Sequence, residues 1–351
     1  MRYEVVVVGA GPIGIEMASV LKRAGIRYLH IEAGQVGHTI TRWPRNTRFF
    51  SSPEWIAIAG IPIHTEGQEI VTGEYYLAYL RHVVELLDLD VRTYERVTAV
   101  TGVKGAFTVT TVDLAGATHE YECASVILAT GDMNTARTIG VPGEDLPHVT
   151  HLWNDPHLYF RRKLLIVGGR NSAVEAAIRC WRAGVDVAIS YRGASLDEKR
   201  LISRLYLEID LMIRNGRIAF HPQTEPVEIR PGAVTLRGAD RTVTDVAADF
   251  VYLATGFEMD YSLYDMLGVQ THDAERKPVH DPRTMESNVP GVYVVGTSIG
   301  GNQRGYKVFI TTSHEHCLAA ARAIAPDAPI RPEWVGNIAS RDYPLSSKDV
   351  E

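Results

Sequence analysis

The stretch VVVVGAGPIGIEMA, residues 5–18, decides the fold of this chain. Its four valines, Val5–Val8, form the continuous apolar run of a parallel strand that is buried on both faces. The glycines that follow have GxGxxG spacing. Gly9 permits a tight turn, Gly11 lets the backbone approach a pyrophosphate, and Gly14 lets the next helix pack on the strand. The pattern predicts a strand–turn–helix unit that binds a dinucleotide.

The residues after this turn agree with that prediction. A helix is expected over residues 12–24, with its N–H groups and positive dipole end directed at the phosphates. A second strand, residues 28–31, ends in Glu32, whose carboxylate can accept hydrogen bonds from ribose hydroxyls. A later strand ends in Ala-Thr-Gly. The residues expected to bind this first dinucleotide are Gly9, Gly11, Pro12, Ile13, Gly14, Glu32, Ala33, Thr130 and Gly131.

A second fingerprint, LLIVGGRNSAVEAA at residues 164–177, is also followed by its own Ala-Thr-Gly. Arg170 stands where a middle glycine is usual and could itself hold a pyrophosphate. At the offset that gives Glu32 in the first unit, the second has Tyr191 followed by Arg192. An acid would repel a 2′-phosphate, whereas a guanidinium pairs with it, so NADPH is expected rather than NADH. The residues expected to bind it are Gly168, Gly169, Arg170, Asn171, Ser172, Arg192, Thr255 and Gly256.

The two fingerprints predict an α/β fold with two Rossmann-like dinucleotide-binding domains. Two such domains in one chain are the layout of a flavoprotein that passes hydride between a nicotinamide nucleotide and FAD, so the first dinucleotide is expected to be FAD. After the second domain the chain returns through NVPGVYVVGTSIGG, residues 288–301, and a helix expected over residues 307–323. This strand and helix most economically complete the first domain. The NADPH domain, residues 158–282, is therefore expected to be inserted into a discontinuous FAD domain, residues 1–157 and 283–351.

Composition excludes several classes of function. The chain has 351 residues, enough for two domains, and its net charge of −6 argues against a nucleic acid partner. No apolar stretch is long enough to span a membrane and no signal peptide opens the chain, so a cytoplasmic location is expected. Two imidazoles in His314-Glu315-His316 lie at i and i+2, on different faces of a helix, so no metal site is expected.

The three cysteines, Cys123, Cys180 and Cys317, are far apart and form no CxxC pair. Structural disulfides are not expected in a reducing compartment. All three are interpreted as inert buried thiols.

The architecture resembles the thioredoxin-reductase-type flavoproteins. The segments NTRFFSSPEWIAIAGIPI (residues 46–63), YYLAYLRHVVE (75–85) and VGGRNSAVEAA (167–177) resemble more closely the YpdA-type bacillithiol disulfide reductases. The resemblance extends to about residue 325. It implies FAD, NADPH and a low-molecular-weight thiol disulfide as substrate.

Two positions bear on this resemblance. Members of the YpdA type often have a cysteine where this chain has Ile13, and that cysteine is proposed to act in disulfide reduction. Many related flavoproteins have Gly-Asp where this chain has Gly296-Thr297, but the YpdA type also tends to lack that Asp. Gly296 and Thr297 are expected to meet the FAD, and Lys307 is a candidate to reach the flavin or its phosphates. Gln303 and Arg304 are further candidates. Trp43, Phe49 and Phe50 would either shape the flavin pocket or anchor their loop.

The leading expectation is an NADPH-dependent flavoprotein that passes hydride to FAD and reduces a small disulfide, with no assigned catalytic residue. The alternatives are a ferredoxin:NADP oxidoreductase serving a small redox protein, and a redox sensor based on bound FAD. The FFSS segment at residues 49–52 argues against the ferredoxin alternative, whereas the tail favours it, because Trp334 or Tyr343 could cover the flavin. A flavin monooxygenase lacks support, because no FxGxxxHxxxF signature lies between residues 132 and 165. A homo-oligomer is expected.

Overall fold

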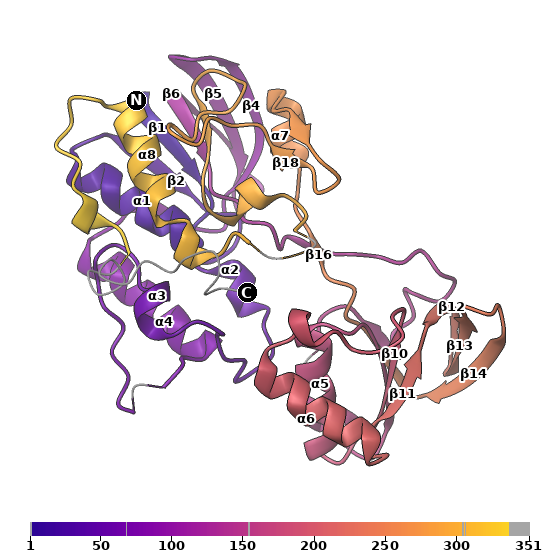
Figure 1. Cartoon of the computed structure of the whole chain (residues 1–351). Coiled ribbons are helices and arrows are strands. Elements are labelled where there is room, and N and C mark those ends of the chain that lie inside the picture. Colours follow the sequence, from indigo (N-terminus) through magenta and orange to yellow (C-terminus); the bar gives the residue numbers. More distant parts are fainter. Residues whose placement is uncertain (1, 68, 154, 304, 306, 337–351) are drawn as a thin grey trace. The chain divides into compact units, whose positions relative to one another are not determined.

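The computed structural model describes residues 2–336 apart from 68, 154, 304 and 306 (Figure 1). The described chain divides into two compact units. Unit 1 contains residues 2–42, 46–135 and 257–336, and unit 2 contains residues 43–45 and 136–256. The predicted α/β class with two Rossmann-like units, one inserted into the other, is confirmed.

Unit 1 is built on a sheet with the strand order β3-β2-β1-β6-β5-β4, and β19 also pairs with β6. Its strands are β1 (Arg2–Val8), β2 (Tyr28–Ile31), β3 (Val91–Arg92), β4 (Arg96–Val103), β5 (Ala106–Val112), β6 (Thr118–Leu128) and β19 (Val292–Val294). The pairs β3-β2, β2-β1, β1-β6 and β6-β19 are parallel, whereas β4, β5 and β6 form an antiparallel meander. The carboxyl ends of β2, β1, β6 and β19 therefore share one edge of the sheet.

The helices of unit 1 are α1 (Pro12–Arg23), α2 (His38–Thr41), α3 (Pro53–Ile56), α4 (Gly73–Leu86), α7 (Ser262–Leu267) and α8 (His314–Ile324). Helices α1 and α8 lie side by side on one face of the sheet (Figure 1). Val5 and Val7 of β1 pack into the core on this face. Val6 and Val8 pack into the core on the other face, with residues of the meander and α7. The apolar run thus supplies both faces, as predicted.

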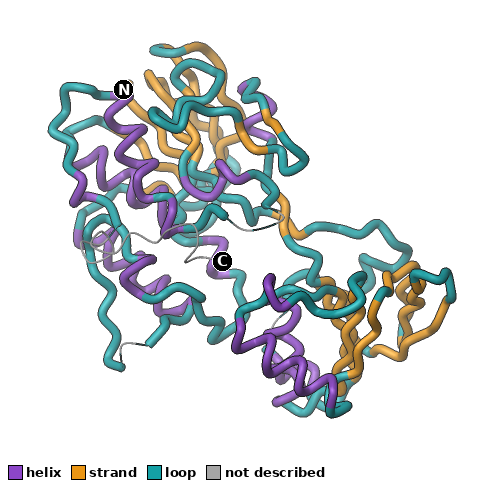
Figure 2. Tube along the Cα trace, viewed as in Figure 1, coloured by secondary structure: helices purple, strands orange, loops and turns teal. Residues whose placement is uncertain are grey.

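Unit 2 has a parallel sheet of order β11-β10-β9-β15-β8 and a separate antiparallel sheet of order β12-β13-β14 (Figure 2). Its elements are β8 (Val149–Thr150), β9 (Lys163–Val167), α5 (Asn171–Arg182), β10 (Asp186–Tyr191), α6 (Ser203–Arg214), β11 (Ala219–Pro222), β12 (Thr224–Arg230), β13 (Gly232–Gly238), β14 (Val243–Ala248) and β15 (Phe250–Leu253). Residues of β9 alternate between a core with α5 and α6 and a core with the antiparallel sheet. Short strands elsewhere are β7 (Thr135–Ala136), β16 (Phe257–Glu258), β17 (Thr271–His272) and β18 (Lys277–Pro278).

The units change at residues 135/136 and 256/257, whereas the sequence predicted 157/158 and 282/283. The first difference arises because β8 pairs in parallel with β15 and so belongs to the sheet of unit 2. The second arises because Tyr264 of α7 is fully buried in the unit 1 core, with β4 residues such as Val100. Both differences depend on pairings across more than 100 residues, which local patterns do not reveal.

The closing helix also begins later than predicted. Helix α8 begins at His314, and Lys307 lies in the loop before it. The side chain of Gln303 captures two backbone donors in this loop. Its Oε1 accepts hydrogen bonds from the N–H groups of Lys307 and Val308, each at 2.9 Å. Such a side-chain bond gives the backbone an alternative to helix.

Candidate cofactor sites

Glycines shape the turn after β1. Gly9 has φ +105°, and a Cβ there would lie 2.5 Å from the carbonyl oxygen of Ala129. A Cβ on Gly14 would lie 1.9 Å from the carbonyl oxygen of Gly9, so α1 begins in direct contact with the turn. The Nε2–H of His30 donates to that same oxygen at 2.9 Å, and burial lowers the pKa of His30 to about 4. The neutral imidazole of His30 in β2 thus stabilises the glycine turn through this hydrogen bond.

Gly11 is a glycine for a different reason. Its φ is −71°, and a Cβ built on it meets no atom within 4 Å. As the N-cap of α1 it provides no side-chain hydrogen bond to the first N–H groups of the helix. Open space beside unpaired backbone donors at a helix N-terminus fits a pyrophosphate.

Glu32 is nearly buried at the end of β2, with 9% of its surface exposed. Its Oε2 accepts a hydrogen bond from the N–H of Ala10, and its Oε1 accepts one from the N–H of Gly34, both at 2.7 Å. The carboxylate therefore fixes the glycine turn as well as standing where a ribose is expected. Each oxygen keeps a further lone pair for a hydroxyl. Ala33, which follows it, is exposed.

The ends of β6 and β19 bring the other predicted residues of unit 1 together. A Cβ on Gly131 would lie 3.7 Å from the Oγ1 of Thr297. The hydroxyl of Thr130 lies 2.9 Å from the phenolic oxygen of Tyr264, which is fully buried. Gly296 has φ +79°, in the region that favours glycine. Two segments about 165 residues apart in sequence thus form one polar surface beyond the strand ends.

Asp132 also belongs to this surface, although no sequence motif indicates it. It directly follows Ala-Thr-Gly and is only 8% exposed. Its Oδ2 accepts a hydrogen bond from the Nε2 of Gln303 at 2.8 Å, and the hydroxyl of Thr297 also bonds to it. The signal in the sequence is an acid immediately after the Ala-Thr-Gly that follows β6.

Ile13 is 5% exposed and fills space at the start of α1. A Cβ on Gly296 would lie 3.3 Å from the Cβ of Ile13, so the residue faces the end of β19. Behind it, the Sγ of Cys317 lies 3.6 Å from the carbonyl oxygen of Ile13. An inert aliphatic side chain therefore stands at the position where related proteins often have a thiol.

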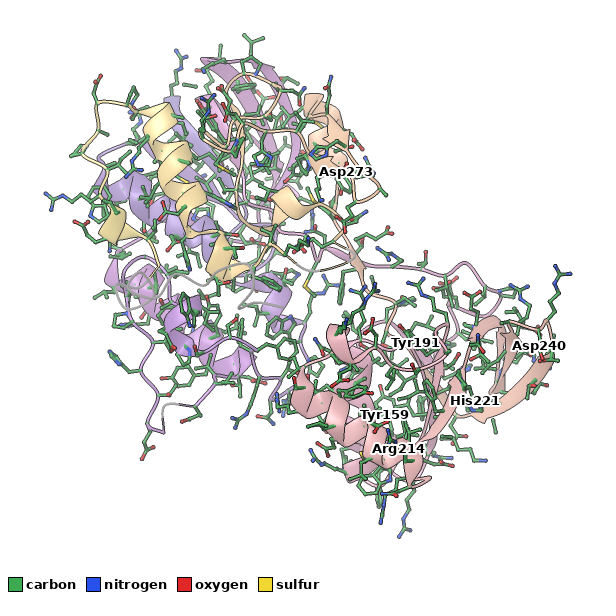
Figure 3. The ribbon with its side chains drawn as sticks, viewed as in Figure 1. Tyr159, Tyr191, Arg214, His221, Asp240 and Asp273 are labelled. Carbon is green, nitrogen blue, oxygen red and sulfur yellow. The ribbon has the colours of Figure 1, made fainter. Side chains whose placement is uncertain are left out.

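The turn of unit 2 repeats the first with other neighbours. Gly168 has φ +144°, and its Cβ would lie 2.7 Å from the carbonyl oxygen of Ala254. A Cβ on Gly169 would lie 2.6 Å from the ring of Tyr191, and so would a Cβ on Gly193. Tyr191 is labelled in Figure 3. Arg170 is the N-cap of α5, and its side chain makes no capping hydrogen bond. The first N–H groups of α5 are available to an anion, as those of α1 are.

The remaining predicted residues of unit 2 have different roles. The Oδ1 of Asn171 accepts a hydrogen bond from the N–H of Ile202 at 3.0 Å, and the hydroxyl of Thr255 donates to the carbonyl of Arg137 at 2.6 Å. Both polar groups are engaged within the protein. Ser172, Gly256 and Arg192 are exposed, and Arg192 forms no ion pair with any residue that the structure describes.

The remaining candidates differ in exposure. Lys307 is exposed, and Arg304 and Tyr343 lie outside the described residues. Phe49 is buried against the ring of Tyr76, with centroids 4.6 Å apart, as its role as a loop anchor requires, whereas Phe50 is half exposed. The described helices include none with the length and hydropathy of a transmembrane span, and the described part of the chain holds no cluster of metal-binding side chains.

The cysteines are all fully buried and unpaired. Burial raises the pKa of Cys123 and of Cys180 to about 12, and raises the pKa of Cys317 well above its ordinary value. A thiolate is the reactive form of cysteine. These thiols therefore lack the ionisation and the access that disulfide exchange requires.

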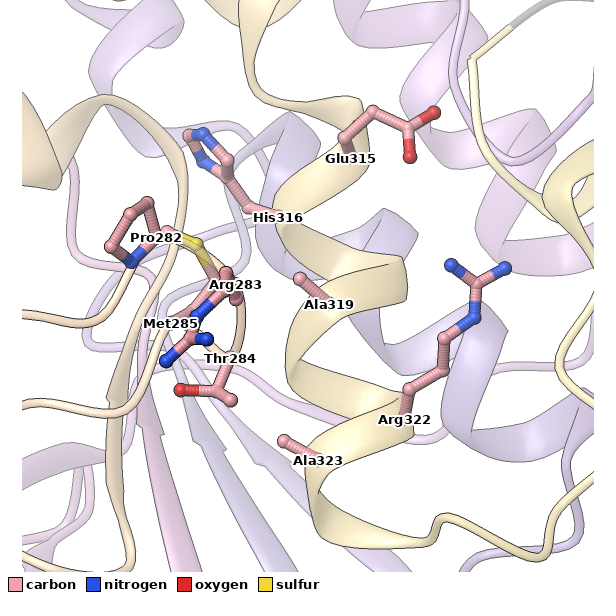
Figure 4. Close-up of a pocket in the computed structure, with 9 residues that line it drawn as sticks. All are labelled: Pro282, Arg283, Thr284, Met285, Glu315, His316, Ala319, Arg322 and Ala323. Atoms are coloured by element: carbon pink, nitrogen blue, oxygen red, sulfur yellow. The ribbon is translucent and has the colours of Figure 1, made fainter.

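A surface hollow lies beside α8 and the segment before β19 (Figure 4). It is lined by Pro282, Arg283, Thr284, Met285, Glu315, His316, Ala319, Arg322 and Ala323. The Nδ1 of His316 accepts a hydrogen bond from the N–H of Gly296 at 3.2 Å, and burial lowers the pKa of His316 to about 4. A neutral imidazole thus links the hollow to the backbone of the predicted FAD site.

Two glycine turns of this kind, each at the carboxyl edge of its own parallel sheet, define an oxidoreductase with two dinucleotide-binding units. Residues 6–296 match the family described as pyridine nucleotide-disulphide oxidoreductase. The chain belongs to this family. The membership confirms the predicted class of enzyme, a pyridine nucleotide disulfide reductase, and its cofactors, FAD and NADPH.

Individual relatives refine the comparison. The chain is 31% identical to bacilliredoxin reductase Bdr of Bacillus subtilis (strain 168), over 93% of this chain and 98% of that protein. It is similar to the solved structure of bacillithiol disulfide reductase Bdr (YpdA) from Bacillus cereus, with 31% identity and a TM-score of 0.89 over 93% of this chain and 99% of that one. A ferredoxin–NADP reductase of Ignicoccus hospitalis is 27% identical over 84% of this chain and 89% of its own. The resemblance to the YpdA type is confirmed.

Proposed function

We propose that unit 1 binds FAD, that unit 2 binds NADPH, and that the electrons pass to a low-molecular-weight thiol disulfide of the bacillithiol type. The observation that supports this most is the contrast between two similar turns. The turn of unit 1 is followed by Glu32, whose Oε2 accepts a hydrogen bond from the N–H of Ala10 in the turn at 2.7 Å. The turn of unit 2 is followed by Arg192, which is exposed. A carboxylate suits ribose hydroxyls, and a guanidinium suits a 2′-phosphate.

In unit 1, Gly9, Gly11, Pro12, Ile13 and Gly14 would form the turn that receives the pyrophosphate. Glu32 and Ala33 would lie at the adenosine end. Thr130, Gly131, Gly296 and Thr297 would lie at the flavin end, because their strands come next across the sheet. Lys307 is exposed and follows Gly296 and Thr297 closely in the sequence, so its side chain would reach a phosphate or the edge of the flavin. The bound FAD supplies the hydride acceptor, while the protein binds it, orients it and excludes water.

In unit 2, Gly168, Gly169 and Arg170 would hold the NADPH pyrophosphate at the start of α5. Ser172 is exposed in the first turn of that helix, so its hydroxyl is available to the same group. Asn171, Thr255 and Gly256 would shape the rim, since the polar groups of the first two bond within the protein.

The disulfide is proposed from the named relatives, the bacilliredoxin and bacillithiol disulfide reductases. The balanced reaction consumes one disulfide, one NADPH and one proton, and yields two thiols and NADP⁺. Such a reaction maintains reduced thiols in the cytoplasm, where we place the enzyme. A homo-oligomer is part of the proposal and is testable by light scattering.

A second candidate is reduction of a small redox protein such as ferredoxin. The similarity to a ferredoxin–NADP reductase and the aliphatic Ile13 in place of a thiol favour it. Neither function requires a CxxC pair, so the cysteines do not separate them.

Anaerobic stopped-flow separates these functions. The yellow protein is first reduced with NADPH, and the reduced form is then mixed with bacillithiol disulfide, with ferredoxin or with oxygen. Rapid reoxidation by the disulfide alone supports the proposal, and rapid reoxidation by ferredoxin alone supports the second candidate. Slow reduction by NADPH with no productive acceptor would indicate a sensor and would overturn both.

A further inference from the structure

Asp132 is a buried carboxyl whose side-chain partners are neutral. Gln303 donates to it at 2.8 Å and Thr297 bonds to it through its hydroxyl. No Lys, Arg or His of the described residues forms an ion pair with it. Burying a carboxylate without a cation is costly, so proteins seldom do so without a functional reason.

A charge on Asp132 is not needed to close the loop that follows Gln303. The Oε1 of Gln303 accepts hydrogen bonds from two backbone N–H groups of the loop, and its Nε2 also donates to the carbonyl of Val308 at 3.0 Å. These bonds close the loop on itself and require no charge on Asp132. Desolvation raises the pKa of Asp132 above its ordinary value, although the bonds from Thr297 and Gln303 lower it. The site would hold the charged form better if more donors were present.

The position of Asp132 indicates where those donors come from. Across the sheet the order is β2, β1, β6 and β19, with Glu32 after β2, the glycine turn after β1, and Asp132 just beyond β6. Ligands of open α/β sheets bind in the crevice outside these carboxyl ends. An extended dinucleotide with its pyrophosphate at the turn would place one sugar at Glu32 and its other half over β6 and β19.

We propose that Asp132 accepts hydrogen bonds from hydroxyl groups of the ribityl chain of bound FAD and so positions the flavin half of the cofactor. The inference rests on the proposed FAD site and assigns a residue that the glycine and Ala-Thr-Gly motifs do not include. Each half of the cofactor would then have its own carboxylate, with Glu32 at the ribose of the adenosine and Asp132 at the ribityl chain of the flavin. Gln303 and Thr297 orient the carboxyl, which keeps lone pairs for the ligand.

The first test measures FAD affinity of the apoprotein by fluorescence titration. A hydrogen bond to a charged group is worth about 1.5–3 kcal/mol, so Asp132→Ala should weaken FAD binding about tenfold to a hundredfold. Asp132→Asn keeps the shape and should lose less. Moving the carboxylate to the segment that follows β19, in the double variant Asp132→Thr with Thr297→Asp, should recover most of the affinity. Gln303→Ala opens the loop and removes one of the two bonds that orient the carboxyl, so it should lose only part of the affinity.

The second test uses FAD analogues that each lack one ribityl hydroxyl. The analogue that lacks the contacted hydroxyl should bind wild type more weakly than FAD does. It should bind Asp132→Ala about as well as FAD does, because the bond is already lost. A purely structural role for Asp132 would give the same ratio in both proteins.

The inference is overturned if Asp132→Ala binds FAD within twofold of wild type, if Gln303→Ala reproduces its whole loss, or if no deoxy analogue shows coupling. These outcomes are distinct from failure of the FAD site itself. In that case wild type would bind no FAD, and Gly11→Val would have nothing to remove.

Discussion

Gly11 and Gly14 lie three residues apart at the start of α1. A substitution at Gly11 should affect FAD binding, whereas a substitution at Gly14 should affect folding. A Cβ at Gly11 has no protein atom within 4 Å, so Gly11→Val should leave the fold intact while its side chain excludes FAD. Gly14→Ala forces a Cβ to within 1.9 Å of a backbone oxygen, so it should lower the melting temperature of the apoprotein. Flavin absorbance and thermal denaturation measure the two effects. Equal destabilisation by both variants would contradict this distinction.

Arg192 is exposed after β10 and should discriminate between the two nicotinamide nucleotides. Arg192→Ala should raise the KM for NADPH about tenfold to a hundredfold and leave that for NADH nearly unchanged, since a charge-assisted bond to phosphate is lost. Arg214→Ala, which removes another exposed arginine of unit 2, is the matched control (Figure 3). An equal loss for both nucleotides would assign Arg192 a structural role.

At the scale of elements, α1 and α8 are joined by a buried ion pair. Glu16 of α1 is fully buried, and its Oε2 lies 2.8 Å from the Nδ1 of His314. Its Oε1 accepts from the N–H groups of Ala59 at 2.8 Å and Gly336 at 2.6 Å. Burial alone would lower the pKa of His314, but the Glu16 carboxylate and the carbonyl of Trp55 raise it above its ordinary value. One carboxylate thus holds four segments of unit 1 together.

This ion pair should make the stability of unit 1 depend on pH. A raised folded-state pKa contributes stability that is fully present below the unfolded value of about 6.5 and is lost as pH rises through the folded value. His314→Gln should therefore lower the melting temperature most at pH 6, and the difference from wild type should narrow toward pH 9. Removing one partner of a buried pair costs about 3–5 kcal/mol. Parallel curves for the two proteins would show that His314 is neutral.

Local patterns predicted the elements that depend on local chemistry. The strands at residues 5–8 and 28–31, both glycine turns and the helix after Gly11 follow from apolar runs and from glycine geometry. The predicted start of α8 at residue 307 was wrong, because the side chain of Gln303 accepts hydrogen bonds from N–H groups of the loop before the helix. Asp132 was missed because its meaning lies in contacts with Thr297 and Gln303, about 165 and 171 residues away in sequence. Such contacts exist only once β6 and β19 have paired.

At the scale of the whole molecule, no described part of the protein offers a reactive thiol. The triple variant Cys123→Ala, Cys180→Ala and Cys317→Ala should keep NADPH-driven flavin reduction and any disulfide turnover. Burial raises the pKa of all three thiols well above its ordinary value, so they stay protonated at neutral pH. Native wild-type protein should also resist alkylation by iodoacetamide. Persistence of flavin reduction with loss of disulfide reduction would make one of these cysteines catalytic.

The interruption of unit 1 has a consequence for how the protein is made. On the ribosome, residues 136–256 emerge before β19 and α8, which occupy residues 292–294 and 314–324. At about 5–20 residues per second, those last segments follow several seconds later. The inserted unit can therefore reach its fold while the surrounding one still lacks a strand, a helix and half of its flavin surface. Nascent chains halted before Val292 should be able to capture a nicotinamide nucleotide but no flavin.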